Sequence, residues 1–226
     1  MRQLIKQLPL VGRLALALKR RLFPSAGFTT SAEYWINRYR DGGNSGAGSY
    51  SHLAAFKAEV LNSFVAEHHI HSVLELGCGD GNQLAYFRFP SYLGFDISDL
   101  VLDQCRAAFG PDPSKRFLPM REAPAHTAEL ALSLDVLYHL IEDDTYHGYL
   151  HQLFAAATRY VIIYAADTDD ARNYAPHVKP RKFTTWVAQY QSDFRLINYI
   201  PNRFPFEEGK NTTTSFADFY IYQRNA

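Results

Sequence analysis

The chain has 226 residues and zero net charge, with 47% apolar and 20% charged residues, which is ordinary for a globular domain with a packed core. The neutral charge argues against a nucleic-acid-binding protein. Two cysteines, Cys78 and Cys105, form neither a disulfide framework nor the spacing of a zinc site. We therefore expect no metal site and a reducing, cytoplasmic location.

Residues 1–30 form a basic, leucine-rich segment, because six basic residues precede the first acidic residue, Glu33. Pro9 suits the first turn of an amphipathic helix over residues 8–23. This stretch is too short and too charged to span a bilayer, and it lacks the cleavage site of a signal peptide. We expect it to pack on its own domain or on a partner. Peripheral contact of residues 1–23 with the inner face of a membrane is an alternative, and a transit peptide is another.

Next come a helix over residues 31–40 with Ser31 as N-cap, a glycine-rich loop over 41–50 and a helix over 51–69. A short buried strand, residues 73–76, then runs into Gly77, Gly79 and Gly81. Glycines at these positions indicate either a tight turn from strand to helix or a loop that a ligand approaches closely.

Strands and helices alternate along the remainder of the chain. Strands are predicted at 92–97, 115–120, 129–135, 159–167, 194–199 and 218–222, and helices at 98–109 (capped by its first serine), 144–157 and 184–191. This alternation predicts an α/β fold with a mostly parallel sheet covered by helices on both faces. Only a loop separates the last two strands, so we expect them to be antiparallel.

A second ligand signal is Asp96, at the end of the strand that follows the glycine loop. A carboxylate there can accept both hydroxyls of a ribose. The glycine spacing is Gly-x-Gly-x-Gly rather than the dinucleotide pattern, and Glu75 and Asp80 would repel a pyrophosphate. An acidic loop suits a ligand with an ammonium and a sulfonium, which points to S-adenosylmethionine.

The stretches "VLELGCGDG", "YLGFDIS" and "LALSLDVLYHL" resemble motifs of class I S-adenosylmethionine-dependent methyltransferases, and the resemblance extends over roughly residues 31–224. It implies a Rossmann-like seven-stranded sheet of order 3-2-1-4-5-7-6 with strand 7 antiparallel. It also divides the chain into the basic segment 1–30 and a methyltransferase domain, 31–226, whose residues 31–50 form a lid.

The resemblance assigns cofactor-binding roles by position. The methionine part would contact Glu75, Gly77, Cys78 and Gly79. Asp96 would hold the ribose and Ile97 would lie beside the adenine. Met120 occupies the adenine-edge position, where an acid is usual and Glu122 comes one step late. Asp135 would face the methionine part or the transferring methyl group.

Three lid residues, Tyr34, Arg38 and Ser45, are candidates to bind the carboxylate and amine of the cofactor, or the substrate. The alternative is a helix that packs on the sheet, followed by a flexible linker.

A basic cluster, "HVKPRKF", follows the fifth strand. Lys179 and Arg181 are candidates to clamp an anionic acceptor such as a phosphate or a uronate. The alternative is a solvated run of charges. Together with the glycine-rich lid, this cluster is similar to small bacterial methyltransferases that modify surface polysaccharides and glycans.

A hydroxyl acceptor also needs a base that works near neutral pH. His139 is the first candidate and His177 the second; the alternative for His139 is a core histidine bonded to backbone. We therefore expect an O-methyltransferase for a small-molecule or glycan-linked acceptor. A catalytically silent S-adenosylmethionine-binding module and a methyltransferase for proteins are alternatives. Neutral charge, and "DVLY" where an "NPPY"-type tetrapeptide would stand, argue against a nucleic-acid substrate.

Overall fold

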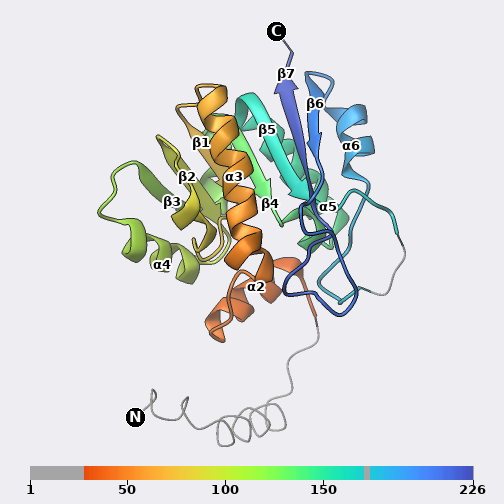
Figure 1. Ribbon diagram of the computed structural model, residues 1–226. Helices are drawn as coiled ribbons and strands as arrows, with labels where there is room; N and C mark the ends of the chain where they lie inside the picture. Colours follow the sequence, from red (N-terminus) through yellow and green to blue (C-terminus); the bar gives the residue numbers. More distant parts are fainter. Residues whose placement is uncertain (1–27, 171–173, 226) are drawn as a thin grey trace, which may run out of the picture.

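The computed structural model describes residues 28–170 and 174–225 and contains a sheet of order β3-β2-β1-β4-β5-β7-β6 (Figure 1). The strands are β1 Val73–Leu76, β2 Tyr92–Asp96, β3 Lys115–Pro119, β4 Ala128–Leu134, β5 Ala157–Ala165, β6 Phe194–Ile200 and β7 Asp218–Arg224. β1 to β5 pair in parallel, and β7 is antiparallel to both β5 and β6. The predicted fold class, strand order and antiparallel finish are therefore confirmed.

The α-helices of the described residues are α2 Ser31–Arg40, α3 Ser51–Glu67, α4 Asp99–Phe109, α5 Asp143–Ala155 and α6 Phe183–Tyr190. Short 3-10 turns add η2 Ala47–Ser49, η3 Gln83–Tyr86, η4 Met120–Ala125 and η5 Leu137–His139. α3 crosses one face of the sheet, α5 lies behind it, and α2 lies at the end toward which the parallel strands run (Figure 1). Within the described residues, the bounds of the predicted strands and α-helices agree with these within two residues.

The apolar core follows from the position of each strand in the sheet. Every residue of the central strand β1 is buried, as expected for a parallel strand covered on both faces. The edge strand β6 is different, since only Phe194 is fully buried. The strands β1, β4 and β5 thus form the buried centre of the sheet, and the carboxyl ends of its parallel strands are where a ligand site is expected.

Two predicted helix caps are corrected by the structure. Thr30, rather than Ser31, caps α2 by accepting a hydrogen bond from the backbone N–H of Glu33, and Ser31 is the first helical residue. Ser98 stands at the N-cap of α4, but its side chain makes no capping bond. Its backbone N–H instead donates to Asp96, so this turn helps to hold the carboxylate at the end of β2.

The glycine loop does not lead into an α-helix. β1 is followed by the four-residue turn η3, and the chain then runs extended to β2. Asn62 on α3 fixes this extended segment, because its side chain donates to the carbonyl of Tyr86 and accepts from the N–H of Arg88. The glycines therefore require an explanation other than a tight strand-to-helix turn.

The basic segment at the start of the chain lies outside the described residues. The predicted helix over 8–23 and the membrane contact of residues 1–23 accordingly stay predictions. Among residues 28–170 and 174–225, no helix is both long enough and apolar enough to cross a membrane.

Candidate active site

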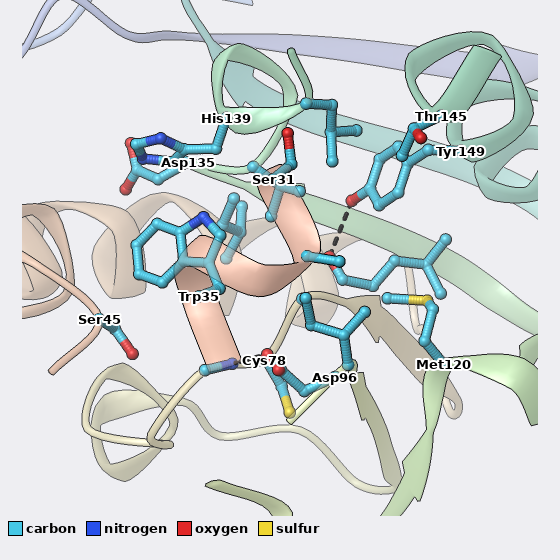
Figure 2. Close-up of a pocket in the computed structure, with 18 of the residues that line it drawn as sticks. Ser31, Trp35, Ser45, Cys78, Asp96, Met120, Asp135, His139, Thr145 and Tyr149 are labelled. Carbon is cyan, nitrogen blue, oxygen red and sulfur yellow. Dashed lines mark hydrogen bonds between the residues drawn. The ribbon is translucent and has the colours of Figure 1, made fainter. Parts of the chain in front are cut away.

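A cavity of about 420 Å³ opens at the carboxyl ends of β1, β2 and β4. Figure 2 shows Asp96 beside Cys78 on one side of it, with Asp135, His139 and Trp35 on the other. Of the residues predicted from the sequence, nine line the cavity: Ser45, Gly77, Cys78, Gly79, Asp96, Ile97, Met120, Asp135 and His139. Within the described parts of the chain, its charged lining groups are two carboxylates, and neither lysine nor arginine lines it.

The glycine loop brings backbone against the cavity where side chains would collide. Gly77 has φ +87°, and a Cβ there would lie 2.6 Å from Val136 Cγ2. Gly79 has φ +59°, and a Cβ there would overlap the hydroxyl of Ser45. The backbone N–H groups of Gly77 and Cys78 both donate to the carbonyl of Phe95 on β2, which fixes the loop. These positions need glycine for conformation and for close approach.

Asp96 ends β2 and is almost fully buried. One carboxylate oxygen accepts from the N–H of Gly79 at 3.0 Å and the other from the N–H of Ser98 at 3.0 Å. Burial raises the pKa of Asp96 to about 6, and the backbone donors partly offset that effect. At neutral pH the carboxylate is ionised, and it lines the cavity. Both properties are required of a group that accepts hydrogen bonds from two hydroxyls.

Asp135 directly follows β4 in a left-handed backbone conformation, φ +61°, where non-glycine residues are rare. Its Oδ2 lies 2.6 Å from Nζ of Lys57, and its Oδ1 accepts from the hydroxyl of Tyr138 at 2.6 Å. Lys57 has no exposed side-chain surface. The sequence analysis missed it, although a signal existed: Lys57 is four residues from both Leu53 and Leu61, on the apolar face of α3.

Glu75 does not line the cavity, although its position predicts contact with the cofactor. It is fully buried and accepts from the hydroxyl of Tyr92 at 2.5 Å and from Nε2 of Gln83 at 3.1 Å. Burial raises the pKa of Glu75 to about 7. Gln83 does line the cavity. Glu75 therefore lies one layer behind the cavity surface and orients the side-chain amide of Gln83.

The lid loop is held to the glycine loop by reciprocal hydrogen bonds. Ser45 N–H donates to Asp80 Oδ2 at 2.9 Å, and Asp80 N–H donates to Ser45 Oγ at 2.8 Å. Tyr50 adds a third bond, from its hydroxyl to Asp80 at 2.8 Å. Tyr39 of α2 shares the Ser45 hydroxyl at 3.0 Å. The loop after α2 therefore packs against the glycine loop, and its role as a lid stays a prediction.

His139 lies on η5 and lines the cavity next to the indole of Trp35, with ring centroids 4.8 Å apart. Its Nδ1 lies 2.9 Å from the carbonyl oxygen of His177. Because a carbonyl only accepts, Nδ1 carries the hydrogen and Nε2 keeps a lone pair. Burial lowers the pKa of His139 to about 4, so the ring is neutral at physiological pH.

Three further predicted residues do not line the cavity but contact residues that do: Tyr34 and Arg38 contact Trp35, and His177 contacts His139. The rings of Tyr34 and His177 stack at 4.2 Å between centroids. Arg38 donates from Nε to the carbonyl of Asn44 at 2.6 Å, which links α2 to the lid loop. Their binding roles stay predictions, and their contacts support residues that line the cavity.

The predicted basic clamp is not brought to the cavity. Lys179 Nζ lies 2.9 Å from Asp143, and Arg181 bonds the carbonyls of Leu140 and Ile141 at 2.7 and 2.8 Å as well as Asp143 at 2.6 Å. These cations hold the pKa of Asp143 at about 2. Since both positive charges have protein partners, this placement does not support an anion clamp.

Comparison with solved structures identifies the fold. Magnesium protoporphyrin IX methyltransferase (ChlM) from Synechocystis PCC 6803 with bound SAH matches with a TM-score of 0.57 and 13% identity, over 94% of this chain and 95% of that chain. N-methyltransferase NodS from Bradyrhizobium japonicum WM9 in complex with S-adenosyl-l-homocysteine gives 0.59 and 10%, over 76% and 86%. A TehB-like SAM-dependent methyltransferase from Corynebacterium glutamicum ATCC 13032 gives 0.50 and 16%, over 86% and 96%.

No model of a protein family and no curated protein matches the sequence. At identities of 10–16%, the structural likeness establishes the fold, which is that of the class I methyltransferases.

Proposed function

We propose that this chain is an S-adenosylmethionine-dependent methyltransferase that methylates a hydroxyl group of a small-molecule or glycan-linked acceptor. One observation carries the proposal. The glycine loop after β1, Asp96 after β2 and Asp135 after β4 line a single cavity within a methyltransferase fold.

The chemistry of the cavity supports this cofactor. Its volume of about 420 Å³ suits one ligand of nucleoside-amino-acid size. Asp96 lines the cavity, which supports binding of a ribose diol, and among the described residues two lining carboxylates without a lining lysine or arginine favour a ligand that carries positive charge. A dinucleotide pyrophosphate would meet repulsion from the same groups. When bound, S-adenosylmethionine supplies an electrophilic methyl group.

The acceptor end of the cavity supports a neutral hydroxyl. The Nε2 atom of His139 remains unprotonated at neutral pH, so it can accept a hydrogen bond from an alcohol and orient it, while the lowered pKa makes the ring a weaker base than a free imidazole. The indole of Trp35 beside it offers an apolar face, which suits a ring that is partly apolar and partly hydroxylated. Lys179 and Arg181 are paired elsewhere, which favours this class over a phosphate.

The residues of the chain contribute chiefly proximity and orientation, which can lower a barrier by several kcal/mol. Asp96 and the glycine loop fix one end of the bound cofactor, and the closed lid loop excludes water. His139 would hold the acceptor hydroxyl and take up its proton.

Titration calorimetry with S-adenosylmethionine and S-adenosylhomocysteine tests the first part of the proposal, and we expect both to bind with one site per chain. Methyl-labelled cofactor incubated with sugars, phenols, organic phosphates and peptides then tests the acceptor. Label in a neutral alcohol supports the proposal, and label in phosphate or peptide only contradicts the acceptor class. Binding without transfer to any acceptor points instead to a catalytically silent binding module.

A further inference from the structure

Lys57 is a charged residue in the interior of the molecule. It lies on α3 with no exposed side-chain surface, and its ion pair is with Asp135. The ring of Tyr164 lies beside it, with its centroid 5.2 Å from Nζ. A buried ion pair is often no more stabilising than apolar residues of the same volume. Stability alone therefore does not account for a buried lysine at position 57.

The partner of Lys57 lies at the wall of the cavity in a constrained position. Asp135 is held by Lys57 on one oxygen and by Tyr138 on the other. Its backbone N–H donates to the carbonyl of Tyr164 at 2.9 Å. The lid loop also covers it, because a Cβ on Gly48 would lie 2.7 Å from Oδ2. A carboxylate has about four acceptor positions, so this one can still accept from a ligand.

The order of the strands places Asp135 at the amino-acid end of the cofactor. β1 lies between β2 and β4 in the sheet. A ligand whose ribose is held by Asp96 at β2 and that crosses the glycine loop after β1 extends toward the end of β4. The group of S-adenosylmethionine that a carboxylate there would hold is the ammonium of its methionine part.

We propose that Lys57 is a positioning residue that fixes the Asp135 carboxylate for binding the cofactor's ammonium group. This inference rests on the proposed function. It explains why a lysine occupies the apolar face of α3, and why both oxygens of Asp135 are held from the side of the protein.

The test compares three ligands on full-length protein by calorimetry: S-adenosylmethionine, S-adenosylhomocysteine and 5′-methylthioadenosine, which lacks the amino-acid part. In Lys57→Met we expect affinity for the first two to fall about 10- to 100-fold, because a charge-assisted hydrogen bond is misplaced. Affinity for 5′-methylthioadenosine should stay within about twofold. A merely structural role for Lys57 would weaken all three ligands alike.

Glu59→Gln is the matched control, since Glu59 lies on the same helix in an exposed ion pair with Arg203; it should leave all three affinities unchanged. Asp135→Asn should reproduce the selective loss, and adding Lys57→Met to it should cause no further loss. If Lys57→Met fails to fold, Lys57→Arg keeps the charge and displaces its donors, and it should show a smaller loss of the same selectivity.

Equal losses for the three ligands, or no loss, would overturn this inference and leave the proposed function intact. Failure of the wild-type protein to bind S-adenosylmethionine and S-adenosylhomocysteine would overturn the proposed function itself, and the inference with it.

Discussion

Ser45 and Asp80 each donate a backbone N–H to the other's side chain, at 2.9 and 2.8 Å, although 35 residues separate them. This pair joins the lid loop to the glycine loop. In Ser45→Ala the N–H of Asp80 loses its acceptor, which costs about 1 kcal/mol of lid closure. We expect cofactor to dissociate about fivefold faster in stopped-flow measurements and amides 41–50 to exchange faster with deuterium.

Ser63→Ala, on the exposed side of α3, is the control and should change neither rate. Unchanged dissociation in Ser45→Ala would show that this pair does not hold the lid closed over the cofactor.

Asp96→Asn should weaken every adenosyl ligand, because the lost carboxylate acceptor faces the ribose that all of them share. We expect a 10- to 100-fold loss for S-adenosylmethionine and for 5′-methylthioadenosine, about 1.5–3 kcal/mol. In the wild type the affinity should also decline as pH falls through about 6, where Asp96 takes up a proton. Calorimetry between pH 5 and 8 measures both, and a loss confined to S-adenosylmethionine would contradict the ribose assignment.

Glu75→Gln should change how stability depends on pH. The pKa of Glu75 is raised from 4.5 to about 7, so the native state binds a proton that the unfolded chain releases. The resulting stability is complete below about pH 4.5 and is lost as pH rises through about 7. The shift corresponds to about 3 kcal/mol.

Urea unfolding at pH 5 and pH 8 measures this effect. Between these values the wild type should lose about 2.5 kcal/mol more than Glu75→Gln does. Equal losses in the two proteins would mean that Glu75 does not titrate in this range.

His139 should give a methyl-transfer rate that is flat with pH. Its pKa of about 4 keeps the ring neutral across pH 6–8, so no inflection is expected near 6.5. His139→Phe preserves a ring and removes the acceptor nitrogen, and we expect the rate to fall about 10²-fold. Single-turnover rates at saturating cofactor measure both. A full rate in His139→Phe would exclude this residue as the base.

Arg181→Ala should lower stability rather than cofactor binding. Its guanidinium bonds the carbonyls of Leu140 and Ile141, and it lies over the ring of Tyr146, with its central carbon 4.3 Å from the ring centroid. Losing these contacts should cost about 2 kcal/mol in urea unfolding. The affinity for S-adenosylmethionine should not change, and Arg203→Ala, at an exposed ion pair, should change neither quantity. A large loss of affinity in Arg181→Ala would show instead that this residue contributes to cofactor binding.

The sheet and the cofactor end of the cavity could be predicted because their signals are local. An apolar run marks each buried strand, and Gly77, Gly79 and Asp96 stand directly at strand ends. A parallel sheet brings these ends to one edge whatever the details of packing. The gathering of these residues at one cavity followed from that, whereas the sheet order followed from the resemblance to class I methyltransferases.

The remaining roles depend on contacts between distant elements, which no local pattern specifies. Lys57 and Asp135 are 78 residues apart, and the apolar face of α3 gave no indication of a partner. Arg181 and its partner Asp143 are 38 residues apart, so this ion pair could not be inferred from the basic segment alone. Glu75 lies on the predicted strand β1, but it does not reach the cavity. Its burial behind Gln83 depends on how β1 and β2 pack.

Ser31, Trp35, Tyr39 and Ser45 line the cavity from a part of the chain that ends before α3, whereas Gly77, Asp96 and Asp135 belong to the strands and their loops. The two sets of lining residues therefore come from separate stretches of the sequence. Altering residues 31–45 disturbs no strand pairing, so in the proposed methyltransferase these side chains can change to suit a different acceptor while Gly77, Asp96 and Asp135 stay in place.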